Sequence, residues 1–123
     1  MPDNSAQRVA APIFAAPLFA ALGDETRLRL VMQLGDDGPT SITGLTAGGV
    51  LSRQAVTKHL GVLQRAGLVR SARLGRENLW HLERQRLAQA QDWLDARSRD
   101  WDDRIDRLRV MAEEQLRSSD GIR

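Results

Sequence analysis

Apolar and polar positions alternate with a helical period over most of this chain, and glycine and proline mark where that period is interrupted. The first apolar stretch predicts a helix that starts at Ala11 or Pro12 and ends at Gly23. Proline suits a first helical turn, whereas Pro17 would either kink this helix or delay its start. The polar residues 1–10 are expected to form a flexible N-terminus.

Two more helices are predicted before residue 50. The first follows Asp24 as N-cap and stops at Gly35, and its apolar stripe is Leu28, Val31, Met32 and Gly35. After the turn "GDDGP", residues 40–49 predict a short helix that begins at Thr40 or Ser41 and ends at two glycines. Its residues are poor helix formers, so this helix must depend on tertiary contacts.

The clearest helical pattern lies between Ser52, a good N-cap, and Gly67, a good C-terminal glycine. At about 100° per residue its apolar side holds Ala55, Val56, His59, Leu60, Val62 and Leu63. The opposite side holds Arg53, Gln54, Thr57, Lys58, Gly61, Gln64 and Arg65. Arginine and glutamine are the side chains that read guanine and adenine in the major groove, and Gly61 would let the backbone approach a phosphate.

After Gly67 the period changes to that of strands. Residues Leu68–Arg73 and Glu77–Leu82 predict a β-hairpin with Gly75 at its turn. A short helix, a turn, a second helix and then a basic hairpin together predict a winged helix-turn-helix. The expected fold class is therefore mostly α with a small β-hairpin.

The last predicted helix runs from Arg84 to Arg117 without proline or glycine, and residues 118–123 are expected to form a flexible tail. A largely apolar stripe at a spacing of three or four residues consists of Leu87, Gln91, Leu94, Trp101, Ile105, Leu108 and Ala112. Such a long stripe cannot be buried on one small domain, so we expect it to meet a second copy. The first helix also has excess apolar residues, and the predicted dimer interface is Phe14, Leu18, Phe19, Leu94, Trp101, Ile105 and Leu108. Residues 11–117 would then form a single DNA-binding and dimerisation domain.

Charge and composition narrow the function. The chain has a formal net charge of +2, yet residues 52–86 hold eight basic and two acidic side chains. Such a basic segment is typical of nucleic-acid binding. There is no cysteine and no tyrosine, and no Ser/His/Asp grouping or phosphate loop supports an enzyme. No apolar run is long enough to span a membrane, and a cytoplasmic location is expected.

The segments "GDETRLRL" and "SRQAVTKHLGVLQRAGLV" resemble the ArsR/SmtB family of bacterial transcriptional repressors, and the resemblance covers roughly residues 17 to 112. It implies a homodimeric winged helix that binds a two-fold symmetric operator in double-stranded DNA. It places Ser52, Arg53, Gln54, Thr57 and Lys58 on the recognition helix. It places Arg73, Gly75 and Arg76 on the wing.

The chain departs from the pattern of the metal-sensing members. The stretch "SITGLTAGG" has none of their cysteines, and the last helix has no histidine; it carries instead the run "WDDRIDRL" of a subgroup without the known metal ligands. His59 and His81 are interpreted as structural, so we expect no metal and no cofactor. Two alternatives stay open: a winged-helix module for protein contacts, and a repressor induced by a small apolar ligand near Trp93 and Trp101.

Overall fold

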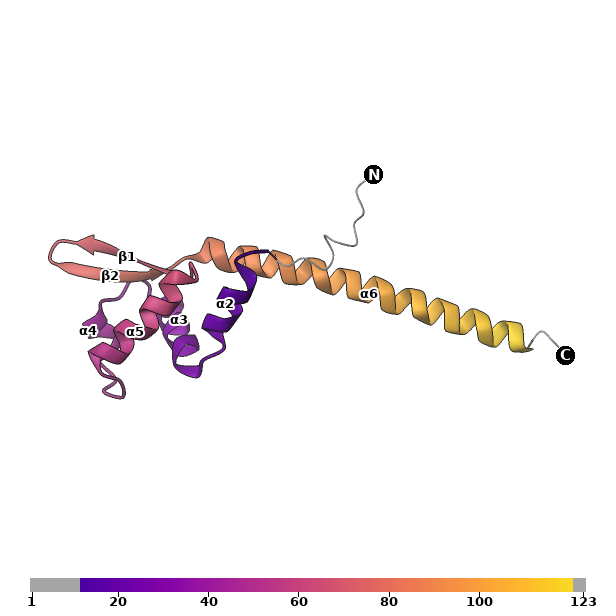
Figure 1. Cartoon of the computed structure of the whole chain (residues 1–123), viewed down its shortest axis with the longest axis horizontal. Helices are drawn as coiled ribbons and strands as arrows, with labels where there is room; N and C mark the ends of the chain where they lie inside the picture. The colour runs from indigo at the N-terminus through magenta and orange to yellow at the C-terminus, as the bar shows by residue number, and fades with distance from the viewer. Residues whose placement is uncertain (1–11, 121–123) are drawn as a thin grey trace. The chain divides into compact units, whose positions relative to one another are not determined.

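The computed structural model describes residues 12–120 and confirms the mainly helical fold with one antiparallel hairpin (Figure 1). The elements in chain order are α2 (Ala15–Leu22), α3 (Glu25–Asp37), α4 (Ile42–Leu45), α5 (Arg53–Arg65), β1 (Val69–Leu74), β2 (Glu77–Leu82) and α6 (Arg84–Asp120). The chain divides into two compact units, a winged-helix unit that ends at Leu87 and a helical unit from Ala88 onward. The predicted N-terminal segment 1–10 lies outside the described residues, and α6 continues past its expected end at Arg117.

Helix α2 begins later than its apolar pattern predicts. Its first residue is Ala15, so Pro17 lies in the first turn, where the missing N–H has no helical partner to lose. Proline therefore delays the helix and does not kink it. Leu18 is completely buried in the core of the winged-helix unit. Its assignment to an intermolecular interface was wrong in this respect, because its side chain is not available at the surface.

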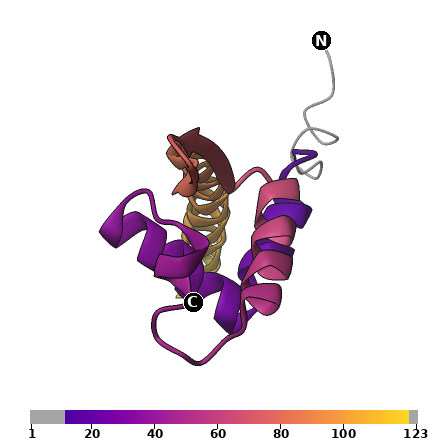
Figure 2. The ribbon, with the colours of Figure 1, turned by 90° about the vertical axis from the view of Figure 1, so that its left-hand side faces the viewer.

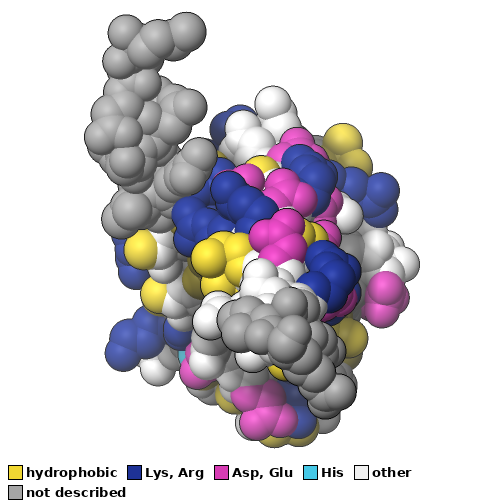
Figure 3. Space-filling view, turned by 90° about the vertical axis from the view of Figure 1, so that its right-hand side faces the viewer, with side chains coloured by type: hydrophobic (Ala, Val, Ile, Leu, Met, Phe, Trp, Pro, Cys, Tyr) yellow, Lys and Arg dark blue, Asp and Glu magenta, His cyan; other side chains and the backbone are white. Residues whose placement is uncertain are grey.

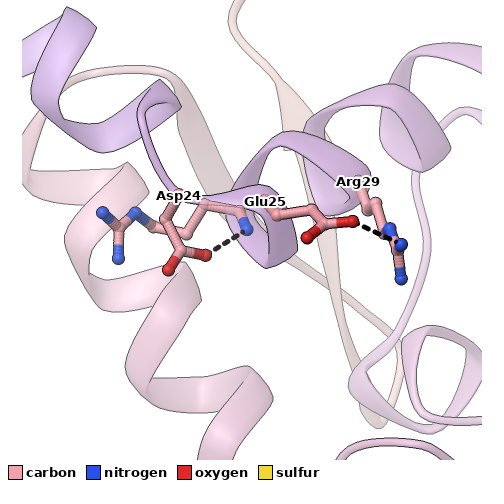
Figure 4. A network of polar contacts seen from close by, with 4 residues as sticks. Asp24, Glu25 and Arg29 are labelled. Carbon is pink, nitrogen blue, oxygen red and sulfur yellow. Dashed lines mark hydrogen bonds and ion pairs between the residues drawn. The ribbon is translucent and has the colours of Figure 1, made fainter.

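The junction between α2 and α3 is held by two side chains of the segment "GDETR" (Figure 4). Asp24 is the N-cap of α3, and its Oδ1 accepts a hydrogen bond from the Arg27 backbone N–H at 3.0 Å. The Arg27 side chain donates from Nε to the Ala21 carbonyl at 2.6 Å and from Nη2 to the Ala20 carbonyl at 3.2 Å. The start of α3 thus satisfies the last carbonyls of α2, which a helix C-terminus leaves unpaired.

The buried face of α3 agrees with the predicted stripe at Val31 but not at Leu28 or Met32. Leu30, Val31 and Leu34 are buried, whereas Leu28 and Met32 are 44% and 58% exposed. The helix also continues through Gly35 to Asp37 and has Gly38 as its C-cap. Apolar residues lie almost all round this helix, so the pattern alone leaves open which side faces α2, α5 and β2.

Helices α3 and α5 and the base of the hairpin enclose the core of the winged-helix unit, which Figure 2 shows end-on. The completely buried side chains after α4 are Val56, Leu60, Leu63, Leu68 and Val69. Thr40 forms an antiparallel bridge to Trp80, with backbone hydrogen bonds of 2.9 and 2.8 Å. This bridge joins the segment before α4 to β2 and so fixes the hairpin relative to the helix-turn-helix.

In the helical unit, every residue from Trp101 to Ser119 is exposed. Its ion pairs between described residues lie three residues apart, Arg97–Asp100 at 3.3 Å and Arg109–Asp106 at 3.9 Å. In the view toward the C-terminal end of α6, basic and acidic side chains are interspersed with hydrophobic ones (Figure 3). None of the helices described is long and apolar enough to cross a membrane.

Candidate nucleic-acid interface

Helix α5 presents one polar face to solvent, while the centre of its apolar face is buried in the core. Ser52 is its N-cap, with extended backbone angles, and its Oγ accepts a hydrogen bond from the Ala55 N–H at 3.1 Å. Val56, Leu60 and Leu63 are completely buried. The side chains on the opposite face are exposed, as the sequence pattern predicts: Arg53, Gln54, Thr57, Lys58, Gln64 and Arg65.

Two contacts orient the first turn of α5. Nη1 of Arg53 donates to Oγ1 of Thr43 in α4 at 3.1 Å, which ties the two helices of the helix-turn-helix together. The Thr57 hydroxyl donates to the Arg53 carbonyl at 2.7 Å. The Thr57 hydrogen is therefore used inside the helix, and this residue offers its methyl group and its acceptor lone pairs to a partner.

The wing is a regular hairpin with a two-residue turn. Its register runs from Val69 opposite Leu82 to Leu74 opposite Glu77, so Gly75 and Arg76 form the tip. Gly75 has φ +64°, and no other residue type in the described chain has positive φ, which together fit a type II′ turn. Nε of Arg73 donates to the Gly75 carbonyl at 3.4 Å and directs that side chain along the tip.

The start of α5 and the wing share one groove, with a volume of about 300 Å³. Arg53 and Arg76, which are 23 positions apart in the sequence, both line it, together with Ser41, Ile42, Thr43, Glu77 and Asn78. Ser41, Thr43 and Asn78 were not predicted as site residues. Nothing in the sequence marks these three residues, because one caps a helix, one is exposed on a four-residue helix and one lies in a strand. Only their position beside the two arginines makes them relevant.

The remaining predicted residues lie outside this groove. Ser52, Gln54 and Lys58 line a separate depression on the same exposed side of α5, with Ala55. Arg73 and Gly75 are exposed near the wing tip. The exposed basic residues therefore follow α5 and then the hairpin, and Glu77 is the acidic residue that lines the groove.

The two histidines lie on different elements, His59 on α5 and His81 on β2. Nε2 of His81 is 3.0 Å from Oε1 of Glu83, and Nε of Arg70 is 3.7 Å from the same oxygen. This cluster lies at the base of the wing. Between residues 12 and 120 no group of three histidine or carboxylate side chains is placed to hold a metal ion.

The predicted dimer residues differ in exposure. Phe19 is 37% exposed, and Phe14 is half-buried with the Arg86 guanidinium 5.2 Å from the centre of its ring. On α6 the apolar side chains are open to solvent, with exposed fractions from 42% to 65% for Leu94, Ile105, Trp101 and Leu108. Such a stripe is typical of a surface that another chain covers.

This arrangement, a capped short helix, a recognition helix with an exposed basic face and a basic hairpin, defines a winged helix-turn-helix DNA-binding protein. Residues 22–72 match the model of a helix-turn-helix domain. The chain is 35% identical to an ArsR-like transcriptional regulator from Rhodococcus sp. RHA1, with a TM-score of 0.76 over 80% of this chain and 92% of that chain. The chain belongs to the ArsR family of transcriptional regulators, whose members are not enzymes.

Two further relatives agree with this family. The uncharacterised HTH-type transcriptional regulator YuzN of Bacillus subtilis (strain 168) is 38% identical over 65 residues, which are 48% of this chain and 71% of YuzN. The structure of HlyU from Vibrio cholerae N16961 is 29% identical, with a TM-score of 0.53 over 74% of this chain and 91% of that chain.

Proposed function

We propose that this protein is a homodimeric repressor that binds a two-fold symmetric operator through α5 and the β1–β2 wing. The observation that carries the proposal is that Arg53 at the start of α5 and Arg76 at the wing tip line one groove. Bases are read in the major groove by a recognition helix, and backbone contacts beside it set the orientation of the protein on the duplex. A groove with one arginine from each element suits both tasks at once.

Dimerisation is supported by the apolar stripe of α6, which is exposed in the single chain. Two copies would present two recognition helices, and half-sites should then lie about 10 base pairs apart, or a small multiple of that. Two-fold symmetry of the protein predicts the same symmetry in its operator.

We also propose that DNA binding does not depend on a metal ion. Sensing of soft metals requires thiolates, and this chain has no cysteine. Zinc is held by histidine, cysteine and carboxylate in a tetrahedral set, whereas α6 carries carboxylates without histidine. The test is a titration of the protein–DNA complex with zinc, nickel, cadmium and arsenite, with chelator-treated protein as reference. Stoichiometric release at micromolar concentration by any of them would contradict this part of the proposal.

Binding to DNA is tested by fluorescence anisotropy with the protein's own promoter region and an unrelated duplex of equal length. If Arg53, Lys58, Arg73 and Arg76 of both subunits contact the duplex, about eight charges are neutralised. The slope of log K against log salt should then approach about −7. A slope near −1, or equal affinity for both duplexes, would favour a winged helix that contacts another protein.

A further inference from the structure

The connection between α4 and α5 is unusually open for a helix-turn-helix. It runs over residues 46–52, whereas about three or four residues are usual. Figures 1 and 2 both show it as a loop that extends away from the two helices. Val50 within it is 87% exposed, although it is an apolar residue followed directly by Leu51 and the N-cap of α5. An exposed apolar side chain next to two glycines indicates that this loop does not pack closely against the rest of the chain.

A pocket of about 200 Å³ lies between this loop and α3. Its apolar lining comes from Leu30 and Leu45, which are buried, and from Val50 and Leu51. Its polar lining comes from Thr26, Arg29, Gln33 and Thr46. This volume exceeds the roughly 150 Å³ of an engineered cavity that binds benzene, so the pocket has room for one small molecule.

Among the described residues that line this pocket, Arg29 is the charged one. Its Nη2 donates to Oε1 of Glu25 at 2.6 Å, but the two side chains are 73% and 79% exposed, and such surface pairs are weak (Figure 4). A guanidinium has five N–H donors and binds a carboxylate with two of them. Gln33 lies one turn further along α3, on the same side, and adds an amide donor.

We propose that this pocket binds a small monocarboxylate with an apolar body, and that its occupancy changes the DNA affinity of α5. The apolar body would lie against Leu30, Leu45 and Leu51, and the carboxylate would accept hydrogen bonds from Arg29. Leu51 precedes Ser52, the N-cap of α5, so a ligand that contacts Leu51 would lie next to the cap that positions Arg53. The coupling to DNA rests on the proposed function, whereas binding to the pocket does not.

The binding test titrates the full chain, in the absence of DNA, with sodium benzoate as the probe. Binding is monitored by ¹H–¹⁵N NMR, and sodium chloride is the reference salt. Amide shifts should concentrate at Leu45, Thr46 and residues 48–51, with a dissociation constant on the order of 1 mM, as suits so small a ligand. Benzamide, which keeps the ring and lacks the charge, should bind at least about tenfold more weakly. Shifts spread over all arginine-rich surfaces would overturn the proposal.

Three variants separate the pocket from general charge effects. Arg29→Gln should weaken benzoate binding about tenfold or more, since it removes a charge-assisted pair. Glu25→Gln leaves Arg29 in place without its competitor, so affinity should be unchanged or higher. Arg109→Gln removes the same charge from α6 and should have no effect. Equal losses in the Arg29 and Arg109 variants would show adventitious binding and reject the site.

The coupling is then measured with operator DNA by anisotropy at saturating benzoate. We expect the dissociation constant for DNA to change by about fivefold or more, the lower end of usual allosteric couplings. In Arg29→Gln the same benzoate concentration should change it little. Benzoate bound in the pocket with unchanged DNA affinity would overturn the regulatory part. Failure of the protein to bind DNA at all would refute the proposed function and leave the DNA-free result standing.

Discussion

At the scale of single residues, Asp24 shows how one carboxylate stabilises the junction between two helices. The hydrogen bond from the Arg27 N–H lowers the pKa of Asp24 below its ordinary value of 3.8, and the Arg27 charge acts in the same direction. Partial burial acts in the opposite direction, and the net pKa is lowered. The ionised carboxylate is thus the form that the folded chain prefers.

This preference makes stability depend on pH in a defined direction. A pKa that is lower in the folded than in the unfolded chain adds stability that is complete well above 3.8 and is lost as pH falls through the folded-state value. Urea unfolding between about pH 5 and pH 2 should show this loss in the natural protein. In Asp24→Ser, which keeps an N-cap but does not titrate, the loss should be smaller. Identical pH profiles for the two proteins would contradict the role of Asp24.

The two arginines of the groove should differ in what they contribute to DNA binding. Arg53→Ala should weaken binding to the operator by about 1–3 kcal/mol and relax the choice of base, because Arg53 lies at the start of the recognition helix. Arg76→Ala should weaken binding to all sequences alike, because a wing arginine contacts phosphate or the minor groove. Anisotropy with operator and scrambled duplexes measures both effects. An equal loss of specificity in the two variants would reject this division of roles.

At the scale of elements, α5 contains one glycine, Gly61, with room for a side chain and is followed by another, Gly67, with positive φ. A Cβ on Gly61 would lie 3.5 Å from Nη1 of Arg65, an ordinary contact. Gly67 has φ +78°, and a Cβ there would lie 2.7 Å from Nε of Arg86. Gly67 therefore ends α5 in a left-handed conformation that favours glycine, and a Cβ there would in addition displace the flexible end of the Arg86 side chain.

The two glycines should respond to alanine with opposite signs. Gly61→Ala should raise the free energy of unfolding by about 0.5–1 kcal/mol, since glycine disfavours a helix interior. Gly67→Ala should lower it by about 1–3 kcal/mol. Gly75→Ala, at φ +64° with no atom within 4 Å of the new Cβ, is the control for backbone strain alone and should cost less than Gly67→Ala. Chemical denaturation of the three variants measures these differences.

Gly61 also tests the DNA-facing side of α5. If the backbone at Gly61 approaches a phosphate, Gly61→Ala should weaken DNA binding while it stabilises the fold. A loss of affinity without a loss of stability separates a contact from a folding defect. Unchanged affinity would indicate that this part of the helix stays away from the duplex.

At the scale of the whole molecule, the stripe of α6 should decide the oligomeric state. Leu108 is 65% exposed, and at about 100° per residue it shares a side of the helix with Trp101 and Ile105. Leu108→Glu should shift the protein from dimer to monomer, because the charge would be buried in an apolar interface. Sedimentation velocity over a range of concentrations measures this shift.

The chain offers a matched control for this experiment. Val110 is 50% exposed and lies two positions, or about 200°, from Leu108 on the opposite side of α6. Val110→Glu introduces the same charge and should leave the dimer intact. If both variants remain dimers, or if both dissociate, the stripe is not the interface.

Features that depend on neighbouring residues could be read from the sequence itself. Asp24 and Ser52 act as N-caps because a cap uses an N–H only three residues away, and Gly75 forms the wing turn because that turn needs positive φ. The polar face of α5 was predictable for the same reason, since its period places every charged residue on one side. The start of α2 was delimited to within a few residues by two prolines.

Only the tertiary structure decided the features that join distant parts of the chain. Which side of α3 is buried depends on the positions of α2, α5 and β2, and Leu18 of α2 is buried because α2 packs against α3 and α5. The Arg27 side chain bonds to a carbonyl of α2, and the Arg53 side chain bonds to Thr43. Arg53 and Arg76 line one groove because α5 and the wing fold next to each other. The hydrophobic period of a helix shows how apolar each of its sides is. The packing of neighbouring elements decides which side is buried and which polar groups form hydrogen bonds with each other.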